Sequence, residues 1–115
     1  MNRFHVGKRL SEMTVHNGIA YLAGQVAEDA SADIRGQTSQ VLAAIDRLLA
    51  EAGTDKSRIL MAQIFIADLS DFAAMNEVWD AWVAPGNAPC RATVEAKLAK
   101  PTWKVEIVVT AAVSS

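Results

Sequence analysis

The most constraining feature of this sequence is a set of mostly apolar residues that recur at helical spacing in residues 32–52. These residues stand three or four positions apart, which places their side chains on one face of a helix. They are Ile34, Thr38, Val41, Leu42, Ile45, Leu48, Leu49 and Ala52. Gly53 follows and predicts the end of the helix, because glycine adopts the left-handed conformation that closes many helices. Such a helix needs another surface to cover its apolar face.

Strand patterns on both sides of this helix predict that surface. Asn17-Gly18 is a hairpin-turn signal that joins expected strands at 13–16 and 19–23. Residues 58–67 are apolar on both faces and predict a buried central strand. A second helix is expected from residue 70 or 71 to about 83. Two further strands, 92–98 and 104–113, are expected to pair through a turn at 100–102.

This order of elements predicts an α+β, ferredoxin-like layered domain with two helices on one face of a mixed sheet. The chain has 115 residues, which suits one domain over residues 1–115. The other sheet face is expected to carry Glu95, Glu106 and Val108, together with Gln63 or its apolar neighbours. Because so short a chain cannot cover that face itself, we expect it to be buried against other copies in a closed assembly.

Charge and cysteine content argue against several partners. The net charge is −2, so no cationic excess is available for nucleic-acid phosphates. Cys90 is the single cysteine, and His5 and His16 lack a third ligand at metal spacing, so no metal site is predicted. No apolar run reaches the roughly 18 residues of a membrane span, and the first residues do not resemble a signal peptide. We expect a cytoplasmic protein.

Several notable residues receive a structural interpretation. The two histidines are interpreted as surface or structural residues, and Cys90 as a small buried or semi-buried thiol. Gln37-Thr38-x-Gln40 is interpreted as a solvated or interface face of the first helix. Trp79 and Trp82 stand at helical spacing, which favours packing over a cofactor site.

Two charged residues are candidates for chemistry. Arg91 stands where a proline-rich loop enters a strand, and its guanidinium can bind a carboxylate with two hydrogen bonds. The alternative is a salt bridge to an acidic side chain. Glu106 lies within an apolar stretch, and a partly buried carboxylate suits proton transfer near neutrality. Its alternative is an exposed strand residue that pairs with Lys97 or Lys104.

Several segments, taken in order, resemble the reactive intermediate deaminase A family (RidA, YjgF-type). The resemblance runs from about residue 10 to 113. Its segments are Ala23-Gly24-Gln25, Gln37-Thr38 with Val41-Leu42 and Ile45, residues 64–76, Pro89-Cys90-Arg91-Ala92-Thr93, and Val105-Glu106-Ile107. Departures from the family pattern are Ala23 and Ala92, where serine is common, and Leu10, where many members have a tyrosine.

The resemblance implies a chorismate-mutase-like fold and a homotrimer with clefts between subunits. It also implies hydrolysis of 2-imino or enamine acids to 2-keto acids and ammonia, as by a 2-iminobutanoate/2-iminopropanoate deaminase, without metal or organic cofactor. By this resemblance Arg91 holds the substrate carboxylate and Glu106 positions water. Gly24, Thr93 and Leu10 line the pocket. A non-catalytic protein that binds or senses a small carboxylate metabolite is the alternative.

The expected hairpin raises a geometric question about this site. It sets Arg91 opposite Thr110 and Glu106 opposite Glu95, an offset of roughly 13 Å along the strands. A substrate of a few atoms does not span that distance. Either the register differs, or the two groups come from different chains.

Overall fold

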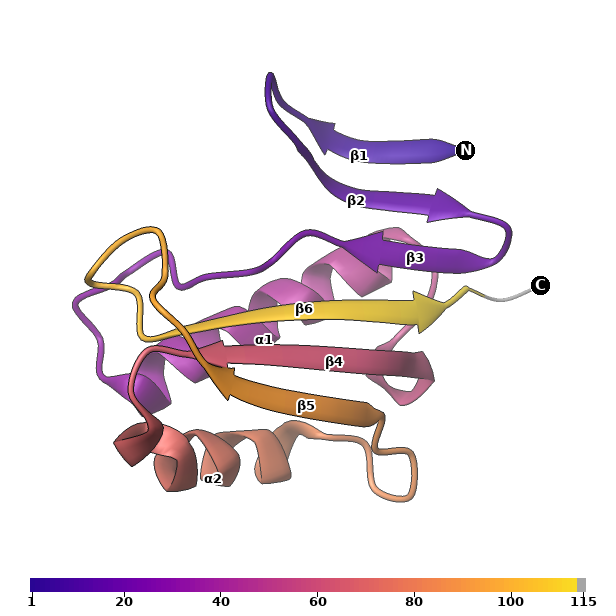
Figure 1. Ribbon diagram of the computed structural model, residues 1–115. Coiled ribbons are helices and arrows are strands. Elements are labelled where there is room, and N and C mark those ends of the chain that lie inside the picture. Colours follow the sequence, from indigo (N-terminus) through magenta and orange to yellow (C-terminus); the bar gives the residue numbers. More distant parts are fainter. Residues whose placement is uncertain (114–115) are drawn as a thin grey trace.

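The computed structural model describes residues 1–113, which form a mixed sheet with helices packed on it (Figure 1). The strands are β1 (Asn2–Val6), β2 (Ser11–His16), β3 (Ile19–Leu22), β4 (Ile59–Ile66), β5 (Cys90–Glu95) and β6 (Val105–Ala112). The helices are α1 (Ile34–Glu51) and α2 (Phe72–Trp82), with 3-10 turns η1 (Lys56–Arg58) and η2 (Leu69–Asp71). Ser114 and Ser115, the end of the expected 1–115 domain, lie outside the described residues.

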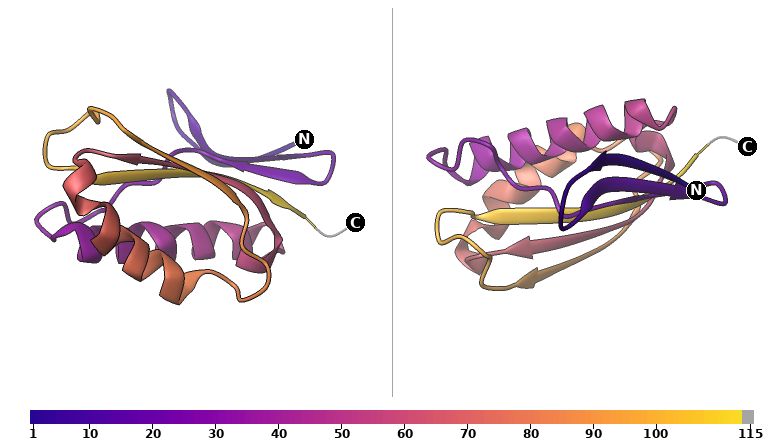
Figure 2. Two further views of the ribbon diagram at one scale, coloured as in Figure 1. Left: turned by 60° about the horizontal axis from the view of Figure 1, so that its bottom comes forward. Right: turned by 90° about the horizontal axis from the view of Figure 1, so that it is seen from above.

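Both α-helices lie on one side of the sheet, as expected for the α+β class (Figure 2). The core lies between the helices and this face. The apolar residues of the helical repeat all belong to this core, with the exception of Ala52, which is half-buried. The sheet contributes alternate residues of β4 and β6 to the core. Within residues 1–113, no helix lies over the opposite face (Figure 2). The arrangement therefore gives the sheet one covered face and one open face.

Local signals set the ends of the elements where the sequence predicts them. Asn17 and Gly18 have φ values of +51° and +77°, which a tight hairpin turn requires. The Asp33 carboxylate accepts a hydrogen bond from the Gly36 backbone N–H at 2.9 Å and caps α1. Gly53 follows the end of this helix at φ +77°. At η2, hydrogen bonds from the Ser70 backbone and hydroxyl lower the pKa of the exposed Asp68.

The expected hairpin of the last two strands is wrong. The sheet order is β1-β2-β3-β6-β4-β5, so β4 lies between β5 and β6. β5 runs parallel to β4, while β6 is antiparallel to both β4 and β3. A parallel pair needs a long crossover, and α2 supplies it. β6 buries every second residue and suits the interior of the sheet, whereas the shorter, more polar β5 suits an edge.

Three expectations about single positions are also wrong. Gln37 is fully buried within its own chain instead of lying on a solvated or interface face, whereas the burial of Thr38 agrees with the helical repeat. Glu95 lies on the covered face, where its Oε2 accepts a hydrogen bond from the Leu69 N–H at 2.9 Å. Cys90 is exposed, because it is the first residue of the edge strand β5 and points to the open face. The remaining difference is an N-terminal strand, β1, that pairs with β2 and was not predicted from its largely polar sequence.

The Gln37 side chain fills a polar gap that no apolar residue could fill. Its Nε2 donates to the carbonyl oxygens of Ala30, Ala32 and Thr102 at 3.0–3.1 Å. Its Oε1 accepts from the Lys104 backbone N–H at 2.9 Å. These bonds give partners to backbone groups of two loops, and this explains why a polar residue lies on the buried face of α1.

The open face consists of three rows of side chains that cross the sheet. The paired residues in these rows are Tyr21, Thr110, Met61 and Cys90; then Val108, Gln63 and Ala92; then Glu106, Phe65 and Val94. Tyr21, Met61 and Val94 are 41–50% exposed although they are large and apolar. The expectation that Gln63, Glu106 and Val108 share this face is confirmed.

Candidate functional site

Arg91 lies on the covered face of the edge strand β5. Its strand partner is the fully buried Ala62, so its side chain points toward α2. There Nη1 donates a hydrogen bond to Asn76 Oδ1 at 2.8 Å. The guanidinium carbon lies 5.2 Å from the centre of the Trp79 ring and 5.9 Å from that of Phe72. We call Phe72, Asn76 and Trp79 the Arg91 seat.

The three residues of the Arg91 seat, which supply its hydrogen bond and its two aromatic ring contacts, are uncharged. Within residues 1–113 the ion pairs are His5–Glu51 and Arg35–Glu77, and neither includes Arg91. The salt bridge considered as the alternative for Arg91 is therefore not observed in this part of the chain. Arginine has five N–H donors, and the seat occupies one of them, so the guanidinium keeps donors and its charge for an anion.

Glu106 lies on the open face, in β6, and is half-buried. A Cβ on Gly24 would overlap the Glu106 carboxylate, so any larger residue at position 24 would require the Glu106 side chain to move. The close approach is fixed by backbone hydrogen bonds of 2.9 and 3.1 Å between Gln25 and Ile107. Within the described residues no ion pair joins Glu106 to Lys97 or Lys104. The carboxylate is thus confined by backbone and not by a cation.

Arg91 and Glu106 belong to opposite faces of one chain. Arg91 is paired through Ala62 with Val109, and Glu106 stands three positions before Val109 on β6. An odd number of positions reverses the face, because successive strand side chains alternate. Two strand spacings and three residues put their Cα atoms about 14 Å apart. The expected pairings with Thr110 and Glu95 are wrong, but the separation they predicted persists.

The other predicted site residues divide between these two places. Thr93 follows Arg91 by two positions on the covered face, and its buried Oγ1 has no hydrogen-bond partner within residues 1–113. Gly24 contacts Glu106 as described. Leu10 is 55% exposed in the turn between β1 and β2. A single chain therefore brings Arg91 close to Thr93, and Glu106 close to Gly24, as two separate half-sites.

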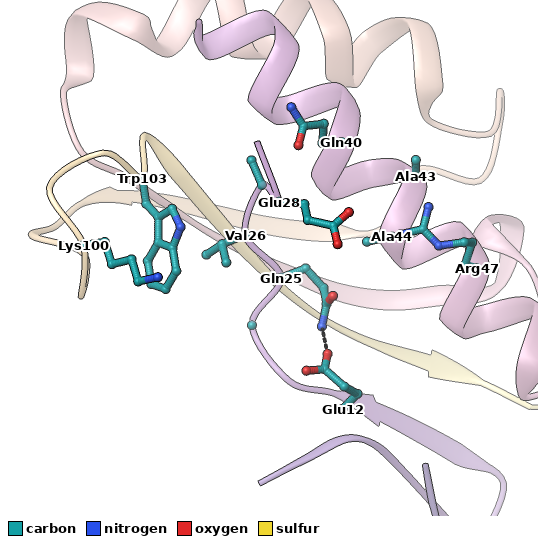
Figure 3. Close-up of a pocket in the computed structure, with 12 residues that line it drawn as sticks. Glu12, Gln25, Val26, Glu28, Gln40, Ala43, Ala44, Arg47, Lys100 and Trp103 are labelled. Carbon is teal, nitrogen blue, oxygen red and sulfur yellow. Dashed lines mark hydrogen bonds between the residues drawn. The ribbon is translucent and has the colours of Figure 1, made fainter. Parts of the chain in front are cut away.

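Sequence analysis did not predict a pocket of about 560 Å³ beside the Gly24 half-site (Figure 3). It opens between α1 and the segment that follows β3. Gly24 lines it, and Gln25 Nε2 donates to Glu12 Oε2 at 2.9 Å on its wall (Figure 3). Its charged side chains come from four separate segments and share no spacing pattern: Glu12, Glu28, Arg47 and Lys100.

Sequence analysis also missed Asn76, which binds the predicted anchor directly. Asparagine inside a helix is a usable signal, because it is a poor helix former that usually serves another purpose there. Within residues 1–113, no group of three or more His, Cys, Asp or Glu side chains is arranged to hold a metal ion. In the same residues, neither α-helix has the length and apolar content needed to cross a membrane.

Comparison with known proteins identifies the family. The family model described as endoribonuclease L-PSP matches residues 1–113. A RutC family protein of Haemophilus ducreyi is 56% identical over 114 residues, which cover 99% of this chain and 97% of that protein. The chain belongs to the RidA/YjgF family. A second RutC family protein, YoaB of Escherichia coli, is 50% identical over 111 residues and 96% of each chain.

Solved structures extend the RidA/YjgF relationship to the fold. A crystal structure of a YjgF family protein from Neisseria meningitidis matches with a TM-score of 0.96 at 48% identity, covering 99% of this chain and 95% of that one. A protein from Pseudomonas aeruginosa matches with a TM-score of 0.97 at 46% identity and 98% coverage of both chains. The family resemblance and the α+β fold predicted from the sequence are confirmed.

Proposed function

We propose that this protein hydrolyses reactive 2-imino or enamine acids to 2-keto acids and ammonia. Membership of the RidA/YjgF family supports a role in small-molecule deamination or related chemistry. The observation that carries the finer proposal is the state of Arg91: a half-buried guanidinium, oriented by neutral groups and without a carboxylate partner in residues 1–113. A cation of this kind suits bidentate binding of a substrate carboxylate.

In the proposed reaction, Glu106 orients a water molecule at the imine carbon and accepts its proton as the C–O bond forms. The electrons of the C=N double bond move to nitrogen, which takes up the proton that Glu106 received. Glu106 then accepts the hydroxyl proton of the resulting carbinolamine and passes it to the amino group while the C–N bond breaks, so that ammonia leaves and the keto acid forms. The reaction consumes one water and needs no change of oxidation state. An imine carbon is already electrophilic, so positioning supplies most of the catalysis.

The proposed active site is shared between two chains of a homotrimer. Within one chain, Arg91 and Glu106 lie on opposite faces and about 14 Å apart, too far for a substrate of a few atoms. Arg91 lies on an edge strand, where a neighbouring chain can approach it. The open face of the sheet carries exposed apolar side chains that an assembly would bury. We propose that Arg91 of one chain and Glu106 of the next complete each site.

The activity is tested by producing an imino acid in place with an amino-acid oxidase and measuring release of the keto acid. We expect the wild-type protein to accelerate release above the spontaneous rate. The Arg91→Ala variant is expected to lose about a hundredfold in kcat/KM, because the charged anchor is removed. No acceleration by the wild-type protein would contradict the proposal.

The same rate assay, combined with a measurement of keto-acid binding, distinguishes the alternative function. Tight binding of a small keto acid without any effect on the rate of keto-acid release would favour a non-catalytic protein that binds or senses carboxylate metabolites. The description of the family model names RNA cleavage. With 11 basic and 13 acidic residues, this chain offers no cationic excess for RNA, so we prefer a small anionic substrate.

Mixing two inactive variants tests whether the site is shared. If Arg91→Ala and Glu106→Gln chains assemble randomly in equal amounts, about a quarter of the interfaces pair an intact Arg91 with an intact Glu106, whatever the ring size. We expect recovery of about a quarter of the wild-type activity after the mixture is unfolded and refolded together. Each variant refolded alone is the control. No recovery in verified mixed assemblies would place both residues in one chain and contradict sharing.

A further inference from the structure

Asn76 has an unusual position for an asparagine, because it lies in the interior of α2 and is half-buried. Asparagine is among the weaker helix formers. The structure supplies a reason for it: Oδ1 of Asn76 accepts the 2.8 Å hydrogen bond from Arg91 Nη1. Trp79 lies three positions later and Phe72 four positions earlier, so all three seat residues share the face of α2 that meets β5.

The chemistry of the seat matters as much as its geometry. An amide oxygen and two aromatic ring faces are attractive to a guanidinium, yet none carries a formal charge. They fix the direction of Arg91 without neutralising it. An aspartate differs from asparagine by one atom and would offer the same oxygen, but it would form an ion pair with Arg91. That internal carboxylate would then compete with the carboxylate of a ligand.

We propose that Asn76 is a positioning residue that keeps Arg91 both oriented and uncompensated, so that Arg91 can bind an anionic substrate. This inference rests on the proposed function, since it assigns Arg91 a carboxylate ligand. It adds that the neutrality of the seat, and not only its shape, determines affinity. Trp79 supports the same role by lying under the guanidinium at 5.2 Å, where tryptophan gives the strongest cation–π contact.

The decisive variant is Asn76→Asp, which preserves size and hydrogen-bond acceptance but adds charge. We expect KM for an imino acid to rise about tenfold or more, while kcat stays within about twofold, because the lost interaction is made equally in the ground and transition states. The Kd for 2-oxobutanoate, measured by calorimetry, is expected to rise by a similar factor. A residue with a merely structural role would leave both constants unchanged.

Asn87→Asp is the matched control. Asn87 is exposed in the loop before β5, and its side chain bonds only to the Pro85 carbonyl among the described residues. This variant adds the same charge to the same chain, and we expect KM and Kd to change less than about twofold. Asn76→Ala is the second variant: it removes the acceptor without adding charge, and we expect a smaller rise in KM than for Asn76→Asp.

The outcomes separate this inference from the proposed function. If Arg91→Ala abolishes 2-oxobutanoate binding and Asn76→Asp leaves it unchanged, the inference about Asn76 is wrong while the anchor stands. If Arg91→Ala itself binds 2-oxobutanoate as tightly as the wild type, the proposed anchor fails. Equal effects of Asn76→Asp and Asn76→Ala on KM would also contradict the inference, because they would show that shape alone matters. Thermal unfolding of each variant verifies that it is folded.

Discussion

The surroundings of the Glu106 carboxylate are set by a segment that is distant from it in the sequence. The segment after β3 passes so close that a side chain at position 24 would overlap its carboxylate. Sequence analysis identifies Glu106 as an acid within an apolar stretch and Gly24 through the family resemblance, but spacing alone does not reveal a contact between positions 24 and 106. The contact arises because Gln25 continues the sheet beside Ile107 after β3 has ended.

The Gly24→Ala variant tests the importance of this contact at the level of one atom. Gly24 does not have a positive φ, so alanine is compatible with its backbone, and the flexible Glu106 side chain must move instead. We expect kcat to fall between about tenfold and a hundredfold, as small misplacements of a catalytic group do. The free energy of unfolding, measured with urea, is expected to change by less than about 1 kcal/mol.

A double variant makes the Gly24 prediction sharper. If alanine at position 24 acts by displacing the Glu106 carboxylate, then adding Gly24→Ala to Glu106→Gln has little further effect on kcat. Multiplied losses in the double variant would mean that Gly24 acts independently of Glu106. Steady-state rates of the two single variants and the double variant complete this cycle.

At the scale of elements, the sequence predicts each helix and most strands but not how the last two strands pair. Periodicity reports which residues share a face, and it identified the buried side of α1 and β6 correctly. It contains no information on which strands are neighbours. Adjacent strands in sequence usually pair, yet here β6 inserts between β3 and β4, and β4 separates it from β5.

Buried polar residues are the other limit of pattern reasoning. Gln37 is predicted to lie on a solvated or interface face of the first helix, and glutamine is indeed mostly exposed in proteins. The Gln37 side chain is buried because four backbone groups of the folded loops bond to it. The local sequence around Gln37 therefore does not predict its burial. The same holds for the division of the candidate site: the identities of Arg91 and Glu106 are available from the sequence, but their placement on opposite faces depends on strand order.

Gln37 connects α1 to the loops before it and before β6, and this connection can be measured. The Gln37→Met variant keeps the volume of the buried side chain but removes its hydrogen bonds to backbone groups of both loops. We expect a loss of about 3 kcal/mol in the free energy of unfolding. Gln40→Met is the matched control, because Gln40 bonds only Asp29 among the described residues, and it is expected to cost about 1 kcal/mol. Urea unfolding at one protein concentration compares them, and equal losses would contradict the role of Gln37.

At the scale of the whole molecule, one chain offers two half-sites and one uncovered sheet face. Arg91 with its neutral seat lies on the covered side at the sheet edge, and Glu106 lies on the open side. These features are consistent with a single explanation: assembly buries the open face and brings the half-sites of different chains together. The explanation predicts that activity and assembly are lost together.

Val108 lies in the middle row of the open face, between the row of Glu106 and that of Tyr21, and it tests this link. Val108→Asp places an unpaired charge where the proposed interface is apolar, so we expect the oligomer to dissociate to single folded chains. Val108→Thr, of similar size and uncharged, is expected to remain assembled. Ser39→Asp, at an exposed position on α1, controls for added charge.

Light scattering coupled to size-exclusion chromatography gives the mass of each variant, and circular dichroism verifies its fold. An assembled Val108→Asp protein would locate the interface elsewhere, whereas a fully active single chain would contradict a site shared between chains.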